Sequence, residues 1–234
     1  VGYAAMIRNT TGQYNVALGL CTLCTNTTGS QNVAVGPYAL NANTTAGYNN
    51  AFGYAALILN TTGANNVAVG HCSLGENTTG ADNTASGYKA LYSNTTASYN
   101  TAYGACTLFA NTTGANNTAV GYRALRQNTC GNMNTASGYM ALQSNTTGCH
   151  NTAFGRTALF NSSTGSYNTA IGAQGMCTNT TGSYNTASGY QTLWKNSTGS
   201  TSTATGMYAL CTSTTGCCNI GIGYNAVPST AAGV

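Results

Sequence analysis

The sequence predicts an all-β protein: a parallel β-solenoid (β-roll) of about 14 coils of 17 residues, with two short strands in each coil. The main observation is a glycine that recurs every 17 residues from Gly2 to Gly223, without insertion or deletion. Loops of globular domains gain and lose residues freely, whereas coils stacked on identical coils do not. Each repeat also holds further Gly and an Asn-Thr-Thr group. This leaves no run of 10 to 12 good helix formers, so a helical solenoid is excluded.

The elements of one coil follow from the repeat 111–127, which begins at Asn-Thr-Thr-Gly. Residues 117–121 alternate in character and predict a first strand, with Thr118 and Val120 on the face opposite to Ala119. A second short strand is expected over 122–125. The Asn-Thr-Thr-Gly group then forms the turn into the next coil, because Gly accepts a positive φ and Asn bonds nearby backbone.

Three sets of residues recur at inward-facing places of the coil. Ala stands in the first strand of nearly every repeat, and a Leu column runs from Leu23 to Leu210, with Met176 and then Val227 in place of Leu. Small residues with one larger side chain per coil suit a narrow lumen. Asn also recurs directly before the first strand, which predicts a ladder of stacked side-chain amides. Its predicted members include Asn32, Asn66, Asn83, Asn100, Asn117, Asn134 and Asn151.

Composition excludes several classes of function. Only 3% of residues are charged, against roughly 25% in an ordinary domain. Acid–base and metal chemistry need side chains that this chain scarcely has, so we expect no enzymatic activity, no metal and no cofactor. Six cations do not make a nucleic-acid-binding face. No apolar run is long enough to span a membrane.

The Asn-Thr-Thr group is also an acceptor pattern for N-linked glycans. Its Thr residues offer acceptors for O-linked glycans equally, and the alternative is that the group only provides turn chemistry. The candidate N-glycosylation sites are Asn9, Asn26, Asn43, Asn60, Asn77, Asn94, Asn111, Asn145, Asn179 and Asn196.

Ten cysteines suggest an oxidising compartment. Cys130 and Cys149 lie in adjacent coils at nearly matching places and are the best candidates for an intrachain disulfide. Cross-links between chains, or thiols that are simply tolerated at outward places, are the alternatives.

Outward-facing columns supply the candidate binding surface. Thr occupies the start of the first strand in eight successive repeats, from Thr84 to Thr203. An ice-binding face would pair this row with a second Thr row, but only Thr205 supplies one. Two interrupted Tyr columns, which include Tyr122 and Tyr167, predict an exposed aromatic surface for self-association or sugar binding.

The core Asn-Val-Ala-Val-Gly at 32–36 and 66–70, with Asn-Thr-Ala-x-Gly elsewhere, resembles the head repeats of trimeric autotransporter adhesins. The phrase Thr-Gly-Ser-Tyr-Asn-Thr-Ala at 164–170 and 181–187 resembles repeats of phage-tail-fibre-like and other long surface proteins. A similar rhythm occurs in ice-binding proteins of grasses. These resemblances imply a β-roll and do not specify a ligand.

We therefore expect residues 1–234 to form a single repeat array, a segment of a longer fibre without separate caps. The expected function is that of a structural extracellular fibre, filament or adhesin shaft on a cell or virion surface, acting by self-assembly and surface display. Its expected partners are copies of itself, and also glycans or a cell surface, but neither nucleic acid nor a membrane interior. The alternative is an ice- or carbohydrate-binding solenoid that uses its Thr and Tyr side chains.

Overall fold

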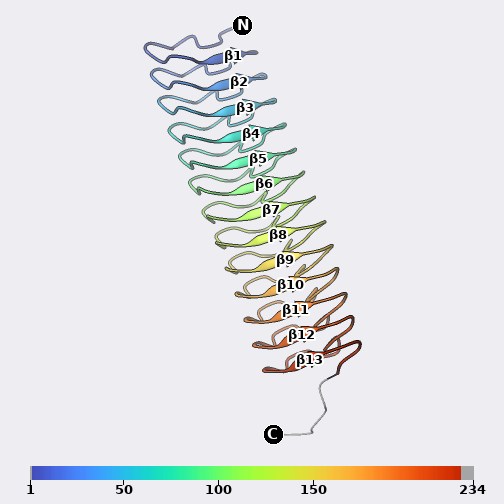
Figure 1. Ribbon diagram of the computed structural model, residues 1–234. Coiled ribbons are helices and arrows are strands. Elements are labelled where there is room, and N and C mark those ends of the chain that lie inside the picture. The colour runs from blue at the N-terminus through green and yellow to red at the C-terminus, as the bar shows by residue number, and fades with distance from the viewer. Residues whose placement is uncertain (1, 228–234) are drawn as a thin grey trace.

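The computed structural model describes residues 2–227 and is a parallel β-solenoid (Figure 1). Its strands form one 13-stranded sheet in sequence order, and Figure 1 shows them stacked in a single column from one end of the rod to the other. Every strand has three residues. The strands are β1 Val16–Leu18, β2 Val33–Val35, β3 Asn50–Phe52, β4 Val67–Val69, β5 Thr84–Ser86, β6 Thr101–Tyr103, β7 Thr118–Val120, β8 Thr135–Ser137, β9 Thr152–Phe154, β10 Thr169–Ile171, β11 Thr186–Ser188, β12 Thr203–Thr205 and β13 Ile220–Ile222.

Successive strands pair in parallel with an offset of one repeat, so that Thr118 faces Thr135 and Ala119 faces Ala136. Residues 17 apart therefore stack on one another. We call such a stacked set a column and name it after its member in or near β7. From β1 to β13 the chain makes twelve turns, close to the predicted number, with residues 1 and 228–234 outside the described part.

The prediction of two strands per coil is wrong, because each coil has one strand and closes through turns. The expected second strand, 122–125, contains Arg123 with φ 56° and Leu125 with φ 51°. Strand residues have strongly negative φ, so this segment cannot be extended. It still bonds to its neighbour, since the Leu125 N–H donates to the Ala141 oxygen at 3.0 Å. Backbone hydrogen bonds thus join each coil to the next in the turns as well as in the sheet.

The inward-facing residues match the predicted core. Ala119 and Leu125 are fully buried, as are the equivalent Ala and Leu residues from the second coil to β12. At the C-terminal end of the Leu125 column, Val227 is 58% exposed and does not continue this core. The left-handed backbone at Leu125 recurs in the column from Met6 to Leu210. Leu disfavours this conformation, so closure and packing of the coil impose it.

The glycine column that reveals the period has a steric cause. Gly121 has φ +122°, and a Cβ placed there would lie 2.6 Å from the Gly138 oxygen of the next coil. Any side chain would separate the two coils, so every coil keeps this Gly. The second glycine of the repeat, the Gly114 column, is less strict because it accepts Ala46 and Ala97.

Candidate functional surface

The surface of the rod carries the functional candidates, because residues 2–227 contain no pocket. Within the same range, no three His, Cys, Asp or Glu side chains are grouped so that they could hold a metal ion. No helix of the described chain is long and apolar enough to cross a membrane. His71 and His150 each lie in a different aromatic stack on the outside of the rod.

The predicted Asn ladder is confirmed in the Asn117 column. Each predicted member is fully buried, and its backbone N–H donates to the side-chain oxygen of the preceding member at 2.9–3.0 Å. The Asn117 side-chain N–H groups donate to the Gly131 oxygen at 2.9 Å and to Asn100 Oδ1 at 3.2 Å. The amides thus replace strand hydrogen bonds where the chain enters the sheet.

The candidate N-glycosylation sites form a second buried ladder, the Asn111 column, which we did not predict. Asn111 Nδ2 donates to the Gly114 oxygen at 2.9 Å and to Asn94 Oδ1 at 3.0 Å. The two ladders meet at shared acceptors, since the Gly131 oxygen receives both Asn117 and Asn128 at 2.9 Å. The recurrence of this Asn in nearly every coil was the available signal for a structural role.

This burial corrects the expectation of N-linked glycans on the folded coil. A glycan replaces a hydrogen on Nδ2 and needs open space outside the protein. The folded coil provides neither a free Nδ2 hydrogen nor open space at these side chains. Asn9, in the first coil, is half-buried and donates to the Gly12 oxygen at 2.9 Å. The other nine are completely buried, with 0% exposure: Asn26, Asn43, Asn60, Asn77, Asn94, Asn111, Asn145, Asn179 and Asn196.

The outer sheet face consists of the Thr118 and Val120 columns, which point away from the core. Thr118 is exposed and Thr135 is half-buried, as predicted for an outward row. Val120, Phe154 and Ile171 are 40%, 44% and 48% exposed. Neither column contains a charged residue. The result is a face of hydroxyl and apolar groups carried by a continuous sheet.

Aromatic side chains stack between coils on either side of this face. Both predicted Tyr columns are exposed. His150, Tyr167 and Tyr184 stack almost parallel, with ring centroids 4.7 and 4.9 Å apart. Tyr122 stacks on Tyr139 at 5.5 Å, in the column that follows the strand. Neighbouring members of one column are both Tyr at 122 and 139 and at 167 and 184, and each of these pairs stacks directly.

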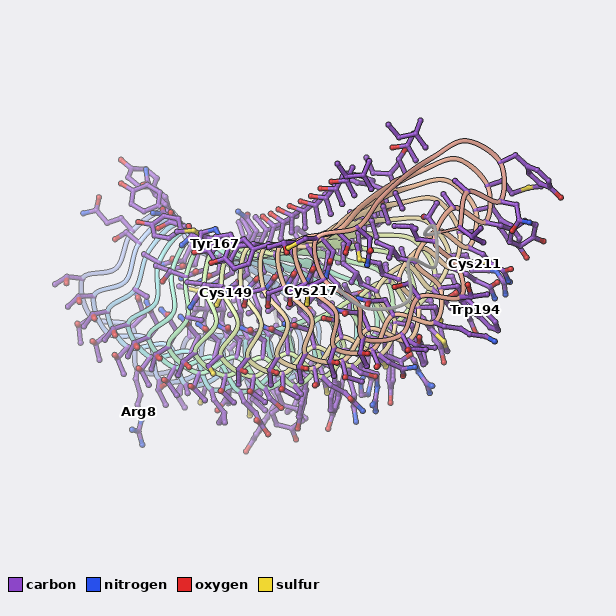
Figure 2. All side chains as sticks on the ribbon, turned by 90° about the horizontal axis from the view of Figure 1, so that it is seen from below. Arg8, Cys149, Tyr167, Trp194, Cys211 and Cys217 are labelled. Carbon is purple, nitrogen blue, oxygen red and sulfur yellow. The ribbon has the colours of Figure 1, made fainter. Side chains whose placement is uncertain are left out.

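All ten cysteines are free thiols in the structure, which corrects the pairing expected for Cys130 and Cys149. Cys130 occupies the place that Thr113 and Thr147 hold in the adjacent coils. Cys149 Sγ instead accepts the Asn132 N–H at 3.3 Å. In Figure 2, Cys149 lies near Tyr167, while Cys211 and Trp194 lie together elsewhere on the coil.

Two other thiols have a raised pKa. Burial raises the pKa of Cys72, and nearby Lys89 opposes part of that rise. Burial likewise raises the pKa of Cys177, opposed in part by Arg156. A raised pKa lowers the thiolate fraction at neutral pH, and the thiolate is the reactive form.

Comparison of the chain with protein-family models, with curated proteins and with solved structures finds no match. The fold of this chain is therefore established by its own structure, and its function is argued from its own surface.

Proposed function

We propose that this chain is a segment of a structural extracellular fibre or adhesin shaft, located on a cell or virion surface. It acts by length, stiffness and surface display, and its main partner is another copy of itself. The observation that carries the proposal is the uninterrupted hydrogen bonding from coil to coil, in one register, along all thirteen strands.

The stiffness of the rod depends on how each coil is stabilised. A single coil of 17 residues cannot bury its own core, so each coil depends on its neighbours. Backbone ladders and the Asn117 ladder join successive coils, and the Asn111 ladder adds to them except at Ser162 and Ser213. These bonds resist bending and sliding of one coil on the next. Twelve turns at about 4.8 Å per step give a stack about 58 Å long. Adding coils would lengthen this stack without altering any existing contact.

The outer sheet face supports lateral association. Its exposed apolar residues follow one side of the rod, including Val69 at 41% and Tyr103 at 63% exposure. An uncharged surface that exposes many apolar side chains tends to be covered by a partner. A second copy presents the same repeat spacing and can match this face over several coils. The resemblance of the Asn-Thr-Ala-x-Gly core to adhesin-head and tail-fibre repeats agrees with such an assembly.

A charge placed on this face tests the proposal. In the double variant Val120→Lys with Ile171→Lys, we expect at least a tenfold weaker self-association by sedimentation velocity, because two ammonium groups would have to be desolvated between copies. The matched control is Gln127→Lys, at an exposed place whose column already contains Lys195. It should associate as the wild type does. All three proteins should give the same circular-dichroism spectrum.

A carbohydrate-binding module is the second candidate, and the stack of His150, Tyr167 and Tyr184 favours it. Aromatic side chains present apolar faces on which sugar rings can pack. The same experiment separates the two candidates. A wild-type chain that remains monomeric at all concentrations contradicts the fibre proposal. If that monomer also binds an immobilised polysaccharide, and Tyr167→Ala abolishes binding, the second candidate takes its place.

A further inference from the structure

One exposed column of the rod is almost uniform in sequence. It is the second Thr of each Asn-Thr-Thr-Gly turn, the Thr113 column, and it is exposed in every coil. Its members are Thr11, Thr28, Thr45, Thr62, Thr79, Thr96, Thr113, Cys130, Thr147, Thr164, Thr181, Thr198 and Thr215. Twelve of the thirteen members are therefore Thr.

Other exposed columns do not show this uniformity. The Gln127 column contains Arg8, Glu76 and Lys195, and the Asn116 column, to which Tyr167 belongs, contains Asp82. The Thr118 column is more regular, but it accepts Val at Val16, Val33 and Val67, Ile at Ile220 and Asn at Asn50. Except at Asn50, what the Thr118 column keeps is β-branching, which suits a strand. The Thr113 column accepts neither Val nor Ile, so what it keeps is the hydroxyl group.

The fold does not use this hydroxyl group. Among residues 2–227, no Thr hydroxyl of the Thr113 column makes a hydrogen bond. The preceding residue provides the contrast, because Thr112 Oγ1 donates to the Thr129 oxygen of the next coil at 3.0 Å. Equivalent bonds repeat along the Thr112 column at 2.9–3.3 Å. Hydrogen bonding to the next coil explains why the first position of the turn is Thr. It does not explain why the second position is Thr.

We propose that the Thr113 column is a linear array of O-glycosylation sites, and that the Asn-Thr-Thr-Gly turn is modified on its second Thr and not on its Asn. The donor is a nucleotide-activated sugar, used by a glycosyltransferase of the producing cell. The Thr Oγ attacks the anomeric carbon, the bond from that carbon to the phosphate oxygen breaks, and a nucleoside diphosphate leaves. The hydroxyl proton passes to a base of the transferase, so no oxidant or reductant is needed.

The geometry selects this residue over its neighbours. A sugar on Thr113 replaces a hydrogen that bonds to nothing, whereas a sugar on Thr112 or Asn111 would replace a hydrogen bonded to the adjacent coil or to the turn. The Thr113 backbone is nevertheless held in place, since its N–H donates to the Thr129 oxygen at 3.1 Å. Attached sugars would also supply the surface polarity that a chain with 3% charged residues lacks. The inference does not depend on the fibre proposal, because a monomeric rod would carry the same array.

Site-resolved mass spectrometry of the full chain, purified from the cells that naturally make it, tests the proposal. Electron-transfer fragmentation should place saccharide masses on members of the Thr113 column. The Thr112 column and the Asn111 column should be bare. The peptide with Thr129 and Cys130 is an internal control, because its turn lacks the acceptor hydroxyl and should carry no sugar.

A native chain with unmodified Thr113-column residues overturns the proposal, and so do saccharides confined to Asn or to the Thr112 column. If the bare chain also slows ice growth, and Thr113→Val with Thr147→Val weakens that effect, the hydroxyl array orders water instead. A second variant guards against misfolding as an explanation. Thr113→Ser expressed in the same cells should retain the saccharide at that residue, whereas Thr113→Val should lose it and keep the wild-type melting temperature.

Discussion

Gly121→Val is expected to destabilise the rod by more than about 3 kcal/mol, because it combines backbone strain with a collision between coils. Gly121 has φ +122°, and a Cβ would lie 2.6 Å from the Gly138 oxygen and 2.8 Å from the Gly138 carbonyl carbon. Both obstacles are backbone atoms, which cannot move aside as a flexible side chain can. Because solenoid coils are stabilised by their neighbours, a break in the middle should split the melting curve into two transitions. Differential scanning calorimetry measures both effects.

Gly175→Ala is the matched control. Gly175 occupies the place of Ala124 in its coil, where its nearest neighbours to an added Cβ are Thr192 Oγ1 at 3.5 Å and Ala170 Cβ at 3.6 Å. We expect unchanged stability or a gain of up to about 1 kcal/mol, since Ala restricts the unfolded chain. Equal losses in the two variants would contradict the steric explanation of the Gly121 column.

The second large effect is expected in the Asn117 ladder. Asn117→Leu keeps a similar volume but leaves the Asn134 N–H without its acceptor, which lies at 3.0 Å in the native coil. It also removes one of the two amide donors to the Gly131 oxygen. A buried donor without a partner costs about 1–3 kcal/mol, so the total loss should reach about 3 kcal/mol. Chemical denaturation of wild type and variant gives the difference in unfolding free energy.

Asn117→Ser should lose about half as much stability as Asn117→Leu. The chain already has Ser at one place of this ladder, Ser202, whose Oγ accepts the Asn219 N–H at 3.2 Å. A hydroxyl thus preserves the bond to the next coil while giving up the side-chain amide contacts. If Ser and Leu are equally destabilising at this place, hydrogen bonding is not what the ladder contributes.

The sequence predicted the parts of the fold that follow from periodicity. Regular spacing of Gly121 and its equivalents implied stacked coils, and alternation across Ala119 implied an inward and an outward face. The second strand was predicted wrongly, because nothing in the residue type of Leu125 favours φ 51°. Its conformation comes from closing a coil around a narrow core, a constraint that local propensity does not contain.

The candidate sites, like the fold, could be predicted only in part from the sequence. One Asn ladder could be predicted, because amides that recur beside a strand in stacked coils can hydrogen-bond along the stack. The role of Asn111 could not, because Asn-Thr-Thr is compatible with turns, buried ladders and glycan acceptors alike. Burial of Asn111 and exposure of Thr113 depend on which way the turn faces, and only the structure provides that information.

The most direct test of the central claim is electron microscopy with fibre diffraction of the native material. The account predicts unbranched filaments longer than the stack of about 58 Å described for one chain, with a meridional reflection near about 4.8 Å from the coil spacing. Short, discrete rods at every concentration would contradict the structural-fibre proposal. Absence of the meridional reflection in aligned samples would contradict the stacked-coil architecture itself.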